Sequence, residues 1–212
     1  MSHFELDTSL YVIPSPAGAY FSAASPEQSK IKNLIIHLMR GRKSVRLDSE
    51  KLKKWTSSNS DDNAFKILYQ AQKEQWIQGV EDMINLPDQS LENTLPNLLS
   101  TLTTTGNVLL ADNEGLSVHA VGFSANAAEE LAALSADIGL LHERHHSVWQ
   151  SHLDLSTSAW GVIDAAGNTH LGFWPLYIGQ QRFVLCIEGI PRLNSPNLVT
   201  LIWLLNNRYQ AF

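Results

Sequence analysis

The stretch that decides the fold is NVLLADNEGLSVHAVGF, residues 107–123. The apolar run 108–111 ends in the turn sequence 112–115, and apolar and polar side chains alternate after it. An apolar run, a turn and an alternating run predict two antiparallel strands joined as a hairpin. The acidic side chains here, Asp112 and Glu114, fall in the turn, where Asp is favoured for backbone reasons. The stretch therefore indicates a structural element rather than an active site.

Residues 125–146 predict a long helix with two different faces. Ser124 stands at the N-cap position before an Ala- and Leu-rich run. We expect one apolar stripe to cover a sheet, and its members are Ala127, Leu131, Leu134, Ile138 and Leu141. A second stripe has almost no side-chain volume and consists of Ala128, Ala132, Ala136 and Gly139. It reflects either the high helix propensity of Ala or a face at which another helix approaches closely.

Three further strands and two further helices complete this half. The strands are expected at 158–164, 170–178 and 182–188, separated by turn sequences at 166–168 and 179–180. A last helix begins at Ser195-Pro196, where proline suits the first turn, and a leucine-rich helix begins at Leu91. The predicted order from residue 91 is helix, two strands, helix, three strands, helix.

This order, the sequence NVLLADNEG and the AEELAAL segment of the middle helix together resemble the roadblock family. The family is named for dynein light chains and includes bacterial partners of small Ras-like GTPases. The resemblance covers residues 91–212. It implies an α+β domain with a five-stranded antiparallel sheet, the 125–146 helix on one face and the two outer helices on the other. It also implies a homodimer in which the middle helix and an edge strand pair with their copies. The small stripe fits this pairing, so the expected dimer interface is Ala128, Ala132, Ala136 and Gly139.

Residues 1–85 are predicted to form a separate small domain. Strands are expected at 9–13 and 19–23, and a first helix from Pro26. A second helix follows a cap at Asp48 or Ser49, and a third follows Asp61 or Asp62. The helix-then-strand pattern that ends at residues 75–79 resembles a winged-helix unit, a module used both for DNA binding and for protein docking. Residues 86–90 are the expected linker.

Charge is unevenly distributed between the two parts. The chain has a net charge of −6, yet residues 1–90 hold 11 basic and 11 acidic residues, whereas residues 91–212 hold 4 and 10. The segment 30–54 is strongly basic. Its candidate DNA-contacting residues are Arg40, Arg42, Lys43, Arg46, Lys51, Lys53 and Lys54. Such a patch is either a DNA-binding surface or a solvated face.

Motifs of enzyme chemistry are absent from the sequence. There is no phosphate-binding loop, no Cys-x-x-Cys and no Gly-x-Ser-x-Gly, so the chain is not itself a GTPase and no cofactor is expected. His142, His145 and His146 have a spacing that suits zinc or nickel, but histidines at a helix C-terminus also interact favourably with the helix dipole. We therefore expect no metal. The single cysteine, Cys186, is expected to be a small core residue.

Localisation is inferred from what the sequence lacks. No apolar run approaches the ~20 residues that a membrane helix requires, and residues 1–9 do not have the basic start and apolar core of a secretory signal. We therefore expect a cytoplasmic protein that does not insert into membranes.

Aromatic residues supply the candidates for partner binding. Trp160, Phe173 and Trp174 fall on predicted strands, where sheet packing is the default; if exposed, they would be candidate hot spots. Trp203 and Leu204 fall largely off the inward stripe of the last helix, so that helix must be covered on two sides. The N-terminal domain is the expected cover, and a partner protein is the alternative.

These observations lead to two functional hypotheses. The first is a non-enzymatic homodimeric adaptor whose partner is a small Ras-like GTPase. The second is a transcription regulator whose basic N-terminal domain binds DNA. Against the second, the candidate recognition helix at residues 61–75 carries only Lys66 and Lys73 as basic residues.

Overall fold

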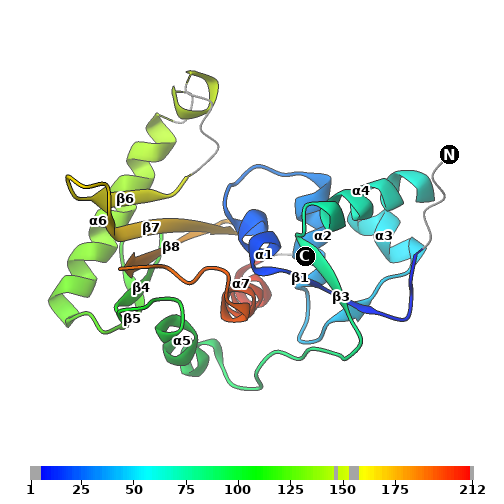
Figure 1. The fold of residues 1–212 in the computed structure, drawn as a ribbon, viewed down its shortest axis with the longest axis horizontal. Coiled ribbons are helices and arrows are strands. Elements are labelled where there is room, and N and C mark those ends of the chain that lie inside the picture. Colours follow the sequence, from blue (N-terminus) through cyan, green and yellow to red (C-terminus); the bar gives the residue numbers. More distant parts are fainter. Residues whose placement is uncertain (1–5, 146–147, 153–157, 211–212) are drawn as a thin grey trace.

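The computed structural model describes residues 6–145, 148–152 and 158–210, and it has an α+β fold built on two antiparallel sheets (Figure 1). The N-terminal half contains β1 (Tyr11–Pro14), α1 (Pro16–Ala23), α2 (Lys30–Leu38), β2 (Val45–Arg46), α3 (Ser49–Trp55), α4 (Asp61–Lys73) and β3 (Ile77–Val80). The C-terminal half contains α5 (Leu91–Ser100), β4 (Val108–Ala111), β5 (Ser117–Val121), α6 (Ala125–Arg144), the short π-helix η1 (Val148–His152), β6 (Trp160–Ile163), β7 (Thr169–Ile178), β8 (Gln181–Glu188) and α7 (Pro196–Tyr209).

The C-terminal half is organised around the larger sheet, whose strand order is β5-β4-β8-β7-β6. All neighbouring strands are antiparallel, so the predicted five-stranded antiparallel sheet is confirmed. The hairpin of residues 107–123 is β4 and β5, as expected. β7 is longer than its neighbour β6, and their pairing ends at Trp160 and Phe173. No β6 residue therefore pairs with Pro175 of β7, so the missing amide hydrogen of this proline costs no hydrogen bond to β6.

The two faces of this sheet pack against different helices. Side chains alternate along β4, so Val108 and Leu110 belong to one buried cluster, whereas Leu109 and Ala111 belong to the other. The first cluster includes apolar residues of α5 and α7, and the second includes Ala128 and Ala132 of α6. The sheet thus lies between α6 on one side and α5 and α7 on the other (Figure 1). Cys186 is buried in the second cluster, and burial raises the pKa of its thiol to about 12.

Helix ends in this half follow the sequence closely. The N-cap side chains are those of Ser90 for α5, Ser124 for α6 and Ser195 for α7, and each accepts a hydrogen bond from a backbone amide of the first turn. The cap at Ser124 and the start of the last helix at Asn194-Ser195-Pro196 were expected from the sequence. The cap at Ser124 fixes the start of α6 directly after the hairpin.

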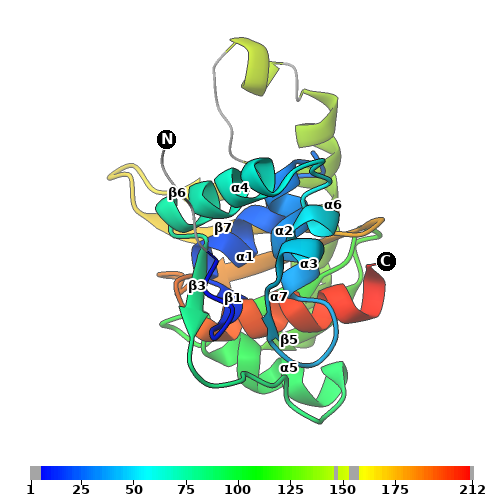
Figure 2. The same ribbon diagram turned by 90° about the vertical axis from the view of Figure 1, so that its right-hand side faces the viewer.

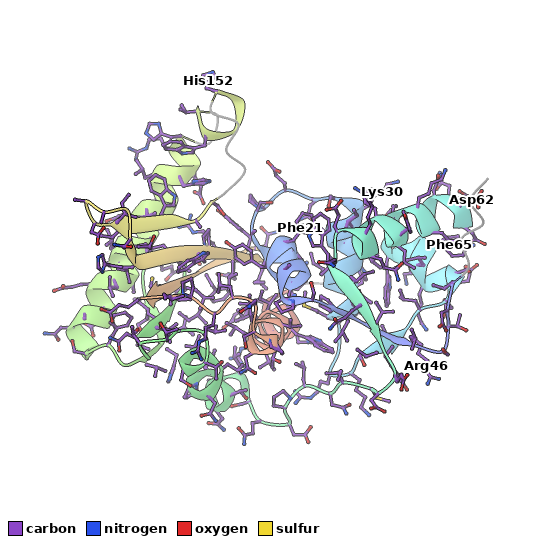
Figure 3. The ribbon with its side chains drawn as sticks, in the orientation of Figure 1. Phe21, Lys30, Arg46, Asp62, Phe65 and His152 are labelled. Atoms are coloured by element: carbon purple, nitrogen blue, oxygen red, sulfur yellow. The ribbon has the colours of Figure 1, made fainter. Side chains whose placement is uncertain are left out.

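The N-terminal half differs from the expected pattern at its start. Residues 19–23, expected as a strand, form the end of α1, which begins after the N-cap Ser15 with Pro16 in its first turn. Gly18 lets this helix approach the backbone of Trp76 closely, because a Cβ at position 18 would lie 1.9 Å from the carbonyl oxygen of Trp76. α1 therefore fits closely against the start of β3, and its Phe21 stacks on Trp76 with ring centroids 3.9 Å apart (Figure 3).

The remaining elements of this half are close to expectation. α2 begins after Ser29 rather than at Pro26, and α4 is capped by Ser60 rather than by Asp61 or Asp62. Asp48 caps α3 as predicted. In the small sheet, β1 lies between β2 and β3, so the first strand of the chain pairs with two strands that follow the helices. The winged-helix resemblance stays a prediction.

The two halves share one hydrophobic core. A single cluster of buried side chains includes Leu34 and Leu38 of α2 as well as Leu201 and Trp203 of α7. Figure 2 shows α7 running beneath α1 and α2. Trp203 is 2% exposed and donates a hydrogen bond from Nε1 to the carbonyl oxygen of Gly41 at 2.8 Å. The N-terminal half therefore packs over the second apolar side of α7, as expected from the sequence.

Candidate assembly surface

The outer face of α6 exposes a row of large apolar side chains. Leu134, Leu140 and Leu141 are 43%, 55% and 40% exposed. Leu134, Ile138 and Leu141 follow one another at helical spacing and line a shallow groove together with Asp137 and Arg144. Large apolar residues that gather on one face of a helix, rather than being scattered singly, indicate a surface that another protein covers.

The edge of the larger sheet at β6 lies near the C-terminal end of this helix, and none of the described residues pairs with its outer side. β6 is the last strand of the larger sheet, and its Val162 and Ile163 are 52% and 64% exposed. It is held next to α6 by Trp160, whose indole Nε1 donates to Nδ1 of His142 at 3.3 Å. An edge strand with apolar side chains is a template for pairing with another strand. We call the following residues of the α6 face and β6 the assembly surface: the exposed Leu134, Leu140, Leu141, Val162 and Ile163, together with the half-buried Ile138, which also packs against the sheet-side cluster.

The small-residue stripe of α6 faces the protein's own sheet. Ala128 and Ala132 are 4% and 0% exposed and pack in the cluster that includes Phe173 of β7. Bulky side chains on the sheet require small ones on the helix, because both must fit in one layer. The expected large stripe is thus divided: Leu131 and Ile138 pack against the sheet-side cluster as expected, whereas Leu134 and Leu141, also assigned to the sheet, point outward. Ala128 and Ala132, assigned to the dimer interface, are covered within the chain, so a dimer through α6 must use the opposite face.

The other members of the stripe also have an intramolecular explanation. A Cβ at Gly139 would lie 2.3 Å from Cζ of Arg182, a β8 residue that is 7% exposed. Arg182 in turn forms an ion pair with Glu143, one helical turn along α6. Gly139 therefore makes room for a buried arginine. Ala136 is half-buried beside Gly115 of the β4–β5 turn, where a Cβ would contact its methyl group at 3.4 Å.

The four residues expected as candidates for partner binding are buried or half-buried. Trp203 and Leu204 are 2% and 6% exposed in the shared core, and Trp174 is half-buried against the same core. Trp160 is half-buried, with its ring edge-on to those of His142 and Trp149. These four residues support the fold, so the surface offered to a partner is aliphatic.

The basic residues of the N-terminal half are interleaved with acidic partners. Lys51 pairs with Asp48 at 2.8 Å, and Lys53 pairs with Glu50 and Asp61 at 2.8 and 3.2 Å. Arg46 lies over the ring of Tyr11, and Arg42 is bonded to the carbonyl oxygen of Pro87 (Figure 3 labels Arg46). Arg40, Lys43 and Lys54 are exposed on the same half. Acidic side chains within the patch repel phosphates, so this geometry disfavours DNA binding.

The three histidines whose spacing would suit a metal have other environments where the structure describes them. His142 is engaged by Trp160, and His145 is the C-cap of α6; His146 lies outside the described residues. Across the part of the chain that the structure describes, no three His, Cys, Asp or Glu side chains are placed to hold a metal ion together.

No family model matches the chain, and no curated protein is significantly similar to it. Within the described ranges, every helix is too short or too polar to span a bilayer.

Proposed function

We propose that this protein is a non-enzymatic adaptor that forms a homodimer through the assembly surface. The observation that carries the proposal is the coincidence of an exposed leucine face on α6 with the free, apolar edge of β6 beside it. A two-fold axis at this place allows α6 to pack on its copy while β6 adds to the copy's sheet, and both contacts become buried together. The roadblock resemblance implies the same pairing.

Charge supports self-association at this surface. Asp137 and Arg144 border the leucine row and are seven residues apart, with Leu140 and Leu141 between them. In an antiparallel helix pair, a two-fold axis near Leu140 places Asp137 of each copy toward Arg144 of the other. The two ends of the groove are therefore complementary to themselves, as a symmetric interface requires.

We propose a small Ras-like GTPase as the partner of the dimer. The support for this partner is the resemblance to the roadblock family, which is an argument by analogy. No arginine of the chain is singled out as a catalytic finger, so the dimer would act on a GTPase by ordering its switch loops.

A pull-down from native cytosol tests this function. The parent protein is used as bait in the presence of GTP or GDP, and a dimer-face variant, Leu141→Arg, is used beside it. We expect the parent to retain a small GTPase in one nucleotide state and the variant to lose it. Recovery of DNA-bound proteins that disappear on nuclease treatment, with no GTPase, would favour the transcription-regulator hypothesis instead.

A further inference from the structure

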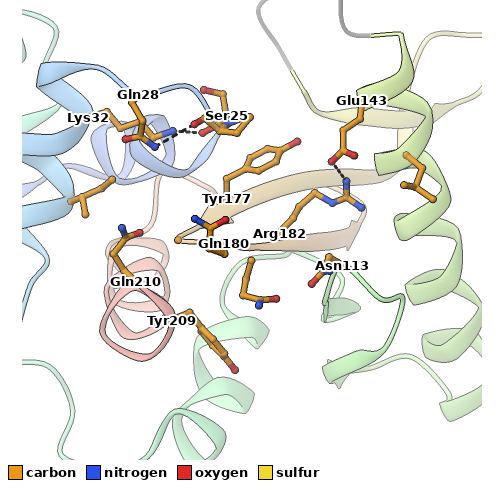
Figure 4. A pocket seen from close by; sticks show the side chains of 15 residues that line it. Ser25, Gln28, Lys32, Asn113, Glu143, Tyr177, Gln180, Arg182, Tyr209 and Gln210 are labelled. Carbon is orange, nitrogen blue, oxygen red and sulfur yellow. Dashed lines mark hydrogen bonds and ion pairs between the residues drawn. The ribbon is translucent and has the colours of Figure 1, made fainter. Parts of the chain in front are cut away.

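A polar groove of about 560 Å³ lies between the two halves of the molecule (Figure 4). Its walls are the segment between α1 and α2, part of α2, the β4–β5 and β7–β8 turns, the end of α7 and the C-terminal part of α6. Amide side chains dominate the lining, including Gln28, Gln180 and Gln210, and Tyr177 rises from the floor. Its volume lies within the range of roughly 300–1,000 Å³ that is typical of small-molecule sites.

Lys32 is a buried cation on one side of this groove. It is 3% exposed, and its ammonium group donates to the carbonyl oxygen of Ser25, a neutral partner. Burial lowers the pKa of Lys32 to about 8, although Glu27 acts in the opposite direction. A buried ammonium that faces a neutral carbonyl is costly unless a negative charge accompanies it.

Arg182 is a second buried cation, on the far side of Tyr177 (Figure 4). Its Nη1 donates to Glu143, but its Nε is buried and has no hydrogen-bond partner among the described residues. Among the described residues of the lining, Glu143 is the one carboxylate, and it is half exposed. These described residues thus carry two buried positive charges and a single negative one, surrounded by amide donors.

We propose that this groove binds a small polyanion whose phosphate or carboxylate groups are held by Lys32 and Arg182. The groove is large enough for a molecule that reaches both sides of Tyr177. The amides of Gln28 and Gln180 supply further donors to such a ligand. This proposal does not rest on the identity of the protein partner, although Leu140 belongs both to the groove lining and to the assembly surface.

The test uses two anions of different chemistry, inorganic pyrophosphate and citrate. The full-length, ¹⁵N-labelled protein is titrated with each at neutral pH and low salt, and amide signals of Gln28, Gln180 and their neighbours are followed. We expect saturable shifts at these positions. Lys32→Met should weaken binding about 10-fold or more, because it removes a charge-assisted hydrogen bond. Lys43→Met removes the same charge from an exposed site outside the lining, and should change the affinity by less than about twofold.

The titrations and the variants distinguish a specific anion site from the absence of one. Saturation by pyrophosphate alone or by citrate alone supports the site and assigns the phosphate or the carboxylate as the recognised group; saturation by both supports an anion site without that preference. Absence of saturation with both anions overturns the proposal, and so does equal weakening by Lys43→Met and Lys32→Met. If Lys32→Met does not fold, Gln180→Ala, at an exposed turn, carries the test: unchanged affinity in that variant overturns the proposal.

Discussion

Gly139 of α6 lies directly against the guanidinium group of Arg182 in β8, so that a Cβ at position 139 would be 2.3 Å from Cζ of the arginine. Arg182 is 7% exposed and is paired with Glu143 on the same helix. The glycine therefore has a packing reason inside the chain. Gly139 therefore belongs to the side of α6 that packs against the sheet, and the exposed leucines lie on a different side of the helix.

Substitution of Gly139 should depend on what occupies position 182. Gly→Ala in a helix interior gains about 1 kcal/mol of intrinsic stability. In the parent this gain is opposed, because the buried guanidinium must move. In an Arg182→Ala background the space is free, and Gly139→Ala should stabilise by about 1 kcal/mol. Urea unfolding of the four proteins of this cycle measures the coupling, and equal effects of Gly139→Ala in both backgrounds would show that the contact is unimportant.

Trp203→Phe should destabilise the whole chain rather than its C-terminal half alone. The substitution removes the hydrogen bond to Gly41 and leaves a small void in the shared core, at an expected cost of about 2 kcal/mol. Far-ultraviolet circular dichroism and aromatic fluorescence should report one coincident transition that shifts as a unit. Two separate transitions, with only one moved by Trp203→Phe, would mean that the halves fold independently.

Lys32 should make stability depend on pH in a defined window. Its pKa falls from 10.5 to about 8 on folding because the ammonium group is buried. Between these two values the unfolded chain binds more protons, so rising pH favours the folded state. The free energy of unfolding of the parent, relative to Lys32→Met, should therefore increase from pH 8 to pH 10.5.

Comparison with Lys32→Met also isolates this effect. Burial raises the pKa of Tyr20 and Cys186 to about 12, so both groups reduce stability at high pH, in the opposite direction. Their contributions are present in both proteins and cancel. Urea unfolding at a series of pH values measures the difference, and a difference that stays flat across the window would contradict the assignment.

The sequence predicts the C-terminal half well because its signals are local. Ser124, the turn at residues 112–115 and Ser195-Pro196 set the limits of their elements through the nearest residues, and the structure has these elements as expected. Residues 19–23 were misassigned because the close approach of Trp76 to Gly18, far along the chain, determines their conformation.

The inward face of α6 was only partly predicted, for a related reason. Both stripes satisfy helical periodicity, and the bulk of the sheet side chains selects Ala128 and Ala132, flanked by Leu131 and Ile138, as the residues that pack inward. Phe173 and Val184 come from strands β7 and β8, which begin at residues 169 and 181, well after the helix ends at residue 144. The edge position of β6, which completes the assembly surface, likewise depends on the strand order and has no local signal.

The burial of Ala132 and the exposure of Leu141 determine which substitution tests the dimer. Ala132→Arg would place a charge in the chain's own core, since Ala132 is fully buried. Leu141→Arg instead places the charge in the centre of the assembly surface. Met83→Arg is the matched control, because Met83 is 41% exposed against 40% for Leu141 and lies in the segment after β3.

The most direct measurement is the molar mass of these three proteins by size-exclusion chromatography with light scattering. We predict that the parent and Met83→Arg have twice the 23.6 kDa mass of the chain, and that Leu141→Arg has the mass of the single chain. A monomeric parent, or a Leu141→Arg variant that remains dimeric at the same concentration, would contradict a homodimer formed through the outer face of α6.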